Sequence, residues 1–357
     1  MTRLPVTPGV RAEMVTTERL TTRVLFTGDP DGVPVLFLHG NVSCATWWEQ
    51  TMLRMPEAYR GIAFDQRGYG ESDPEALVDA TLGLADMSDD AIALMDHLGI
   101  DKAFVCGNSL GGVIVWRMMM DHPGRLLGVV QAGPGSPYGF GSTHDVDGKP
   151  NYDDDYAGSG GGVINRELVR ILGEGDRSTD HPMSPRSAIR MLVWGPGIIP
   201  DWEDALIEAT FATRVGDDGY PGDFVASPNW PYFAPGVKGA SNGLSPKYLD
   251  DPQRMIDLEK KPPVLWIRGA QDLAIADPAA SDPANLGHHG LIPDYPGPEV
   301  YPPQPMIGQI RHVLDRYAEA GGEYREVAVE NSAHVPFITH PEPYDEAFHT
   351  FLEEHRS

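Results

Sequence analysis

Short apolar runs alternate along this chain with segments in which apolar residues recur at helical spacing. Runs typical of buried strands occupy residues 33–38, 61–64, 103–106, 126–131, 263–267 and 324–329. Apolar residues three or four positions apart predict helices over residues 88–98, 110–120, 307–317 and 344–352. Strands that alternate with helices predict an α/β fold, in which helices cover both faces of a mostly parallel central sheet.

The middle of the chain interrupts this alternation. Residues 134–262 are rich in Gly, Pro, Asp and Trp, with helical patterns only near residues 165–173, 184–194 and 203–214. We therefore predict that residues 1–133 and 263–357 form the α/β core. Residues 134–262, called the lid segment below, are predicted to form a large inserted lid, or cap, over one edge of the sheet.

The charge balance limits the partners that the surface can attract. The chain has 27 Lys and Arg residues against 52 Asp and Glu residues, a formal net charge of −25 over 357 residues. Such a surface repels nucleic acid phosphates and anionic membranes. We expect a small-molecule substrate that is neutral, hydrophobic or cationic, whereas the oligomeric state cannot be read from the sequence.

Cysteine usage and the N-terminal residues indicate the compartment. Cys44 and Cys106 are the only cysteines, too few for a secreted disulfide framework. Residues 1–11 contain no apolar run like that of a signal peptide, and no stretch resembles a membrane span. A cytoplasmic location is the expectation.

The sequence Gly107-Asn108-Ser109-Leu110-Gly111 lies between the predicted strand 103–106 and the predicted helix 110–120. This G-x-S-x-G pattern is weak by itself and much stronger between a buried strand and a helix. A sharp turn there exposes the serine oxygen, and the glycines allow a close strand–helix approach. The positive end of the helix dipole would face the same oxygen. We predict that Ser109 is a nucleophile.

Two further motifs extend this pattern. Residues 36–41 read Leu-Phe-Leu-His-Gly-Asn, and residues 65–72 read Asp-Gln-Arg-Gly-Tyr-Gly-Glu-Ser. With the serine turn, they resemble the strand ending in His-Gly, the D-x-R-G-x-G-x-S loop and the nucleophile turn of the α/β-hydrolase superfamily. The resemblance covers residues 12–133 and 263–357, not the lid segment, and is closest to serine hydrolases of the esterase and lactonase kind.

The resemblance implies a Ser–Asp–His catalytic triad, in that chain order. Asp272 ends a buried strand and a Gly-x-x-Asp turn that resembles the family's acid loop. Some members carry the acid one strand earlier, but residues 131–133 read Gln-Ala-Gly here. His334 follows the last predicted strand and precedes the closing helix, where the family places its catalytic histidine.

Alternatives remain open for both positions. The link from residue 273 to residue 306 is longer than the family usually has, so Asp277, Asp282 or Asp294 could supply the acid. The 273–306 segment could also cover the pocket. His39 is the main competitor of His334, although its place in the His-Gly motif favours a role in holding loops. His288 and His289 are interpreted as exposed loop residues.

A tetrahedral intermediate needs two donors for its oxyanion. We expect the backbone amides of Leu110 and Asn41 to supply them, and the Asn41 side chain either adds a third donor or caps a turn. Aromatic residues near the oxyanion loop and in the lid segment could form apolar walls or only the lid's own core; the candidates are Trp47, Tyr138, Phe140, Trp194 and Trp230.

No metal and no cofactor are expected. The acidic residues between 145 and 155 do not fit a calcium loop, and no H-E-x-x-H or paired C-x-x-C motif occurs. The glycine run at 158–162 lacks the residues of a phosphate-binding loop and suggests a hinge.

The residues favour cleavage of a carboxylic ester or lactone through an acyl-enzyme. A serine at position 109 differs from the Asp of the family's dehalogenases and epoxide hydrolases. The Val-Ser after Asn41 differs from the loops of its proline peptidases and C–C bond hydrolases. Amide hydrolysis, C–C cleavage and peracid formation remain less favoured alternatives on the same triad. A ligand receptor on this fold is the non-enzymatic alternative, and its signature would be a broken triad.

Overall fold

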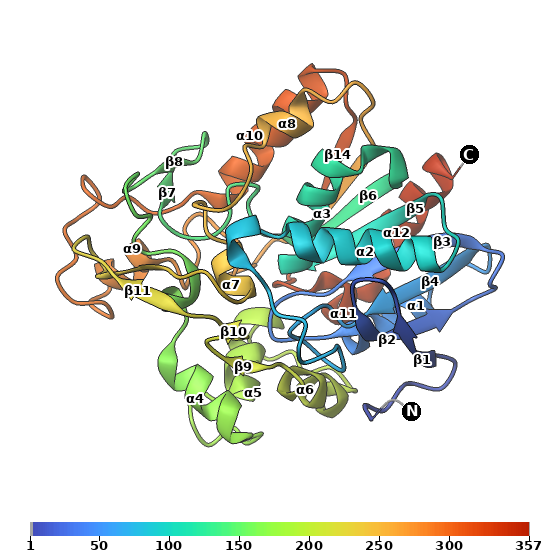
Figure 1. Ribbon diagram of the computed structural model, residues 1–357, viewed down its shortest axis with the longest axis horizontal. Helices are drawn as coiled ribbons and strands as arrows, with labels where there is room; N and C mark the ends of the chain where they lie inside the picture. Colours follow the sequence, from blue (N-terminus) through green and yellow to red (C-terminus); the bar gives the residue numbers. More distant parts are fainter. Residues whose placement is uncertain (1–2, 357) are drawn as a thin grey trace.

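A computed structural model describes residues 3–356 (Figure 1). An eight-stranded sheet runs through the core in the order β1-β2-β4-β3-β5-β6-β13-β14. The strands are β1 (Arg11–Thr16), β2 (Thr21–Thr27), β3 (Val33–Leu38), β4 (Tyr59–Phe64), β5 (Ala103–Ser109), β6 (Leu126–Pro134), β13 (Val264–Gly269) and β14 (Tyr324–Val329). β1 and β2 are antiparallel to their neighbours, and every pair from β4 to β14 is parallel.

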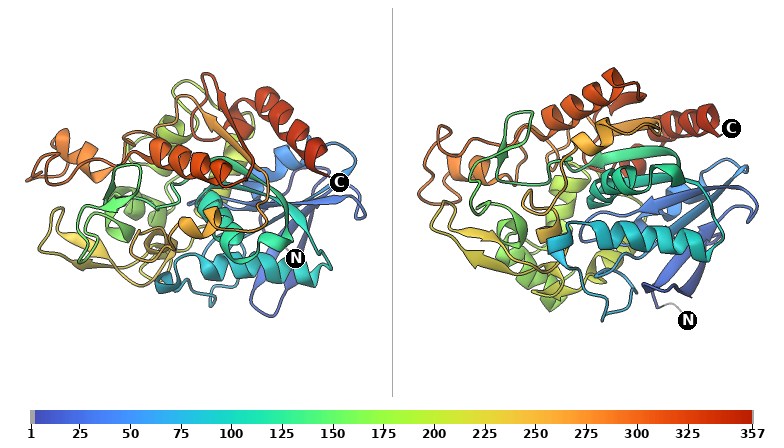
Figure 2. Two further views of the ribbon diagram at one scale, coloured as in Figure 1. Left: turned by 90° about the horizontal axis from the view of Figure 1, so that it is seen from above. Right: turned by 45° about the horizontal axis from the view of Figure 1, so that its top comes forward.

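Alternation along the strands divides the core into two apolar layers. In β3, Leu36 and Leu38 face one layer, whereas Val35 and Phe37 face the other. The first layer is covered by α2 (Ala85–His97), α3 (Leu110–Asp121) and α10 (Met306–Glu319), and the second by α1 (Glu49–Leu53), α11 (Pro336–Thr339) and α12 (Pro341–His355). The two views in Figure 2 show the sheet between these helices. The predicted α/β-hydrolase architecture is confirmed.

The lid segment contributes no strand to the central sheet of the described chain beyond the end of β6. Its elements are short: β7 (Thr143–His144), β8 (Lys149–Pro150), α4 (Arg166–Glu174), α5 (Pro185–Ala188), a π-helical turn (Ile189–Val193), α6 (Glu203–Phe211), β9 (Val215–Gly216), β10 (Tyr220–Pro221), β11 (Phe224–Ala226), β12 (Phe233–Pro235), α7 (Ala240–Gly243) and α8 (Gln253–Ile256). In Figure 1 its green and yellow ribbon gathers at one end of the sheet.

The 273–306 segment carries α9 (Pro283–His288) and packs against the lid segment. Trp230 packs with Tyr301, and the Tyr301 hydroxyl donates to the carbonyl oxygen of Ala157 at 3.2 Å. Gln304 Nε2 donates to the carbonyl oxygen of Gly139 at 3.0 Å. The two insertions therefore stabilise one another.

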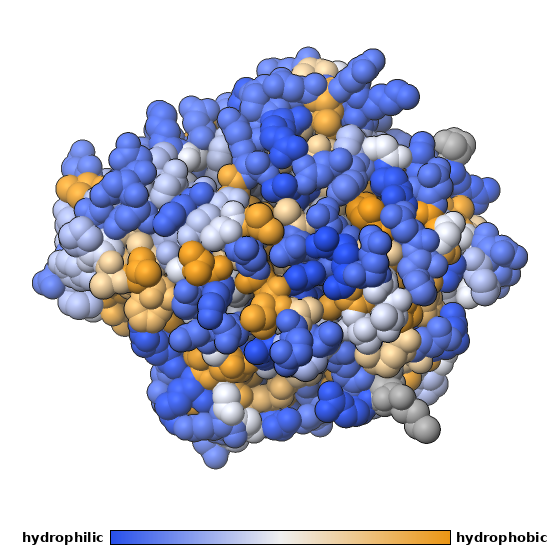
Figure 3. All heavy atoms as spheres, in the orientation of Figure 1, coloured by the Kyte–Doolittle hydropathy of each residue, from blue (hydrophilic) through white to orange (hydrophobic). Residues whose placement is uncertain are grey.

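The face in Figure 3 is mostly hydrophilic, with apolar side chains in small separate groups. Within residues 3–356, no helix combines the length and the apolar character needed to cross a membrane.

Candidate active site

The turn at Ser109 is formed by close backbone packing. Ser109 is the last residue of β5 and has φ 53° and ψ −115°, a conformation that costs energy for any residue except glycine. A Cβ on Gly107 would lie 2.4 Å from the carbonyl oxygen of Gly111, and one on Gly111 would lie 2.2 Å from that of Leu38. Both glycines are therefore required by contact, and the strand, turn and helix follow one another as predicted.

His334 and Asp272 meet behind this turn. Nδ1 of His334 lies 2.8 Å from Oδ2 of Asp272, and both side chains are buried. The other carboxylate oxygen of Asp272 accepts from the amides of Ala274 at 2.8 Å and Ile275 at 3.1 Å. In a neutral imidazole that donates from Nδ1 to this carboxylate, Nε2 keeps a free lone pair.

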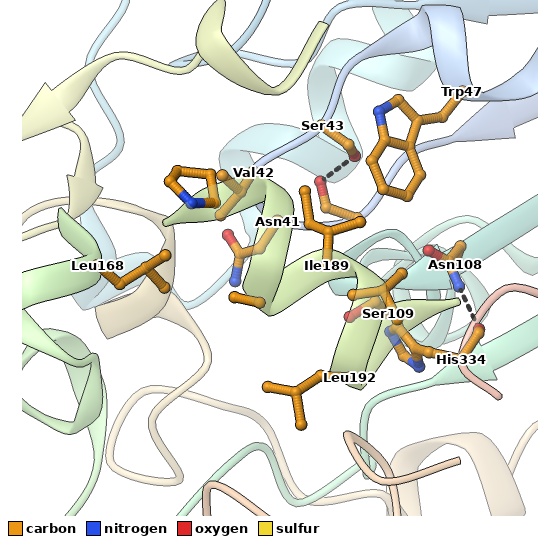
Figure 4. A pocket seen from close by; sticks show the side chains of 14 residues that line it. Asn41, Val42, Ser43, Trp47, Asn108, Ser109, Leu168, Ile189, Leu192 and His334 are labelled. Carbon is orange, nitrogen blue, oxygen red and sulfur yellow. Dashed lines mark hydrogen bonds between the residues drawn. The ribbon is translucent and has the colours of Figure 1, made fainter. Parts of the chain in front are cut away.

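Ser109 and His334 line the same cavity, and Figure 4 shows their side chains next to one another. Within residues 3–356, no hydrogen bond joins the Ser109 hydroxyl to the ring. In enzymes without substrate, such bonds are often long and tighten only in the reactive complex. That Ser109 passes a proton to His334 stays a prediction.

The three alternative acids are used elsewhere. Asp277 accepts from the amides of Ile307 and Gly308 at the start of α10. Asp282 caps α9 and accepts from the amide of Gln304 at 3.0 Å. Asp294 occupies a turn with φ 58° in the same insertion. Among the predicted acids, the structure brings only Asp272 to His334.

His39 holds two loops together. Its Nδ1 lies 2.9 Å from the carbonyl oxygen of Gly40, and its Nε2 accepts from the amide of Gln66 at 3.1 Å. Burial lowers the pKa of His39 from 6.5 to about 4, because the charged ring would lose its hydration. A neutral, fully bonded imidazole at this position joins the loop after β3 to the loop after β4. His288 and His289 are exposed near the end of α9.

The two predicted oxyanion donors belong to segments next to the serine. Leu110 is the first residue of α3, so its amide has no acceptor inside the helix. Asn41 follows Gly40, whose Cβ, if it existed, would lie 3.1 Å from that of Ser109. The loop after β3 is thus packed directly against the turn. Whether these two amides bind an oxyanion stays a prediction.

A cavity of about 160 Å³ opens beside Ser109. One wall comes from the loop after β3, another from the serine and histidine loops, and a third from the lid segment. Its lining residues are Gly40, Asn41, Val42, Ser43, Trp47, Asn108, Ser109, Leu168, Pro185, Ala188, Ile189, Leu192, Val193 and His334. Figure 4 shows Ile189 and Leu192, from the π-helical turn, beside Ser109 and His334. The walls are mainly aliphatic.

Of the five predicted aromatic wall residues, the structure places only Trp47 in this cavity. Trp194 is fully buried in the second apolar layer, and Phe140 packs against the first. Tyr138 lines a separate hollow beside α8, and Trp230 packs between Tyr295 and Tyr301. The prediction that these four line the cavity is corrected: they stabilise the lid segment. Nor does the 273–306 segment reach the cavity.

Sequence reasoning missed the aliphatic wall, although a signal for it existed. Pro185, Ala188, Ile189 and Leu192 follow the i, i+3, i+4, i+7 spacing of one helix face. That face could have been assigned to the lid's interior or to the cavity, and only the fold decides between them.

Comparisons with known proteins identify the family to which this fold belongs. A family model described as alpha/beta hydrolase fold matches residues 33–295. Proline iminopeptidase of Arabidopsis thaliana is 37% identical over 106 residues, which are 30% of this chain and 28% of that protein. Epoxide hydrolase B of Mycobacterium tuberculosis is 34% identical over 123 residues, covering 31% of this chain and 34% of that protein. The chain thus spans about a third of the length of these curated relatives.

Solved structures match over nearly the whole chain. Carboxylesterase CesB of Bacillus subtilis has a TM-score of 0.57 and 16% identity, covering 96% of this chain and 91% of its own. Naproxen esterase of Bacillus subtilis has a TM-score of 0.53 and 17% identity, covering 98% and 93%. Sequence identities this low are evidence for a common fold only. The family model, the sheet order and the serine turn agree, and the chain belongs to the alpha/beta hydrolase fold family.

Proposed function

We propose that this chain is a serine hydrolase that cleaves a carboxylic ester or lactone of a small, neutral and mainly apolar molecule. One observation carries the proposal. A histidine held by a buried carboxylate at 2.8 Å shares a cavity with a serine in the strained conformation of a nucleophile turn.

The reaction would proceed in two halves. Nε2 of His334 takes the Ser109 proton while Oγ attacks the ester carbonyl, and the amides of Asn41 and Leu110 hold the oxyanion. The intermediate collapses with loss of the alcohol, which receives the proton from His334. Water, deprotonated by the same nitrogen, then attacks the acyl-enzyme and releases the acid. Asp272 stabilises the imidazolium in both halves.

The cavity walls support the substrate class. Volumes near 150 Å³ can hold a benzene molecule, so this cavity fits one ring or a chain of about four to six carbons. Each methylene buried against aliphatic walls contributes about 0.8 kcal/mol.

The two curated relatives suggest other reactions that this site supports less well. An aminopeptidase has to bind a substrate ammonium group, and the cavity-lining residues among 3–356 include no carboxylate. The serine at position 109 differs from the aspartate that the resemblance implies for epoxide hydrolases.

Two measurements on the full chain test the proposal. A fluorophosphonate probe should label Ser109, located by mass spectrometry, and Ser109→Ala should remain unlabelled with an unchanged fold. A panel of p-nitrophenyl esters and lactones of increasing size should show turnover that the variant lacks. Full activity in Ser109→Ala would contradict the proposal. Tight ligand binding without labelling would favour a receptor, and turnover of anilides but not esters would favour an amidase.

A further inference from the structure

The side-chain amide of Asn41 is fixed from behind by Tyr69. Tyr69 lies in the loop after β4, is almost fully buried, and donates its hydroxyl proton to Oδ1 of Asn41. Burial raises the pKa of Tyr69 well above its usual value, so the hydroxyl remains protonated. Because the protonated phenol donates to the Asn41 oxygen, that oxygen faces Tyr69 and the NH₂ group is turned the other way.

The loop that carries Asn41 is held from several directions. Val42 has φ 54°, which is a genuine outlier for a β-branched residue. Ser43 Oγ donates to the carbonyl oxygen of Gly40 at 2.9 Å, and the His39 ring lies edge-on to Tyr69 with centroids 5.3 Å apart. Such strain persists only where the surroundings over-determine the backbone, and it concentrates at functional sites. The loop therefore presents Asn41 in one orientation.

The Asn41 amide faces the cavity with a donor to spare. Asn41 lines the cavity together with Ser109 and His334, and Figure 4 shows its amide among the wall side chains. Within the described part of the chain, its Nδ2 donates to no protein acceptor. Asn41 is half-buried, and among the described residues its Nδ2 is not one of the fully enclosed polar atoms without a partner, so it can be reached from the open cavity. A substrate oxygen that enters between the mainly aliphatic walls can therefore accept a hydrogen bond from it.

We propose that Asn41 Nδ2 is a specificity-determining donor for a second acceptor oxygen of the substrate, close to the scissile ester, and that Tyr69 is its positioning residue. The substrates favoured are small esters with an ether, keto or hydroxyl oxygen within an otherwise apolar chain. The oxyanion itself is left to the backbone amides. This inference rests on the proposed ester hydrolysis and adds to it a preference for oxygenated substrates.

Three esters of nearly equal size provide the test: butyl butyrate, butyl methoxyacetate and 2-methoxyethyl butyrate. Each ether ester differs from the first by one CH₂-to-O exchange, in the acyl or the alcohol part. Values of kcat/KM are measured in a pH-stat and divided by the rate constants for hydroxide hydrolysis, which removes intrinsic reactivity. We expect the natural chain to prefer one ether ester about tenfold, as one good hydrogen bond predicts.

Variants then assign the preference. Asn41→Leu should abolish it, because leucine has similar size and no donor. Tyr69→Phe should reduce it to about threefold, because the amide remains but loses its anchor. Tyr138→Phe, which removes a hydroxyl from a hollow outside the cavity, is the matched control and should leave the preference intact.

Distinct results would overturn the inference. Equal normalised rates on all three esters would do so, and so would an Asn41→Leu variant slowed by one common factor. Failure to hydrolyse any of the three by a chain whose Ser109 is labelled would overturn this inference alone. Failure with unlabelled Ser109 would remove the proposed function as well.

Discussion

The carboxyl edge of the sheet and the lid segment hold their side chains by different means. At the sheet edge, Ser109 and Asp272 are fixed by backbone contacts, glycine packing and loop amides. In the lid segment, α5 and the π-helical turn are tied to α6 mainly by the carboxylate of Glu203, which accepts from Arg186 and Arg190 at 2.6–2.7 Å, and the exposed Asp204 also accepts from Arg186 at 2.8 Å. Backbone packing gives the precision that proton transfer needs, whereas side-chain ties suit a wall that can vary.

A hydrogen bond joins the lid segment directly to His334, the proposed general base. The amide of His334 donates to the carbonyl oxygen of Val193 at 3.0 Å, and Val193 itself lines the cavity. In the π-helical turn, the amide of Trp194 bonds to the carbonyl of Ile189, five residues back, and the Val193 carbonyl is directed to the histidine loop. The comparison therefore predicts large, substrate-independent effects at the edge and smaller, substrate-dependent effects in the lid.

The largest effect is expected for Asp272→Asn. The amide oxygen can still accept from Ala274 and Ile275, so the loop should keep its shape. The NH₂ group would face Nδ1 of His334 and favour the wrong tautomer, which costs about 10³–10⁴-fold in kcat in comparable triads. Steady-state kinetics on several esters should show the same loss for each.

Asp277→Asn is the matched control for that prediction. Asp277 lies in the same loop region but caps α10, and kcat should change less than about twofold in this variant. If Asp277→Asn reduced kcat more than Asp272→Asn, Asp272 would be the wrong choice for the triad acid. The 273–306 segment would then contribute to the site at the sheet edge.

The second effect concerns the stability of the edge in acid. His39 has a folded pKa of about 4 and an unfolded value of 6.5, so the unfolded chain binds more protons between these values. The stability that neutral His39 contributes is complete above pH 6.5 and is lost as the pH falls to about 4. The loss is on the order of 3 kcal/mol.

Urea unfolding at pH 7.5 and 4.5 measures this dependence. His39→Gln should be less stable than the natural chain at pH 7.5, because its loop hydrogen bonds change, but should lose less on acidification. His289→Gln removes an exposed histidine and should reproduce the natural pH dependence. If the free energy of unfolding of His39→Gln fell as much between pH 7.5 and 4.5 as that of the natural chain, the loops at the sheet edge would not depend on a neutral imidazole.

The same contrast explains what the sequence could predict. The serine turn could be predicted because its G-x-S-x-G pattern is local and lies between a strand and a helix, although Gly111 is required by contact with the distant Leu38. The order of strands places Asp272 and His334 at the same edge. The sequence analysis did not predict β1, because this strand is largely exposed and its sequence contains no apolar run. Trp194 was misplaced because an aromatic residue in an irregular segment packs against whichever core the fold brings near it. The bond from Tyr69 to Asn41 joins two loops and has no local signature.

A third, intermediate effect is expected for Glu203→Gln in the lid. The variant removes the charge that both arginines share in a largely buried position, and charge-assisted hydrogen bonds are worth about 1.5–3 kcal/mol. We expect KM to rise about tenfold and kcat to fall less than threefold. Glu208, like Glu203, lies on α6, and Glu208→Gln breaks only an exposed ion pair with Arg177, so it should leave KM and kcat unchanged. An equal fall of kcat on every ester would show that the bond from Val193 to His334 transmits lid disorder to the base.

The smallest effect is expected for Leu192→Ala, which tests whether the lid wall selects the substrate. Removing this side chain enlarges the cavity and leaves the triad untouched, so longer acyl chains gain room and shorter ones lose contact. The ratio of kcat/KM for hexanoate over butyrate p-nitrophenyl esters should rise about fivefold, close to 1 kcal/mol. Met191→Ala alters the neighbouring, exposed position outside the cavity and should leave that ratio unchanged. If both variants changed the ratio equally, chain-length selectivity would depend on the stability of the π-helical turn as a whole. Contact between Leu192 and the substrate would then not determine it.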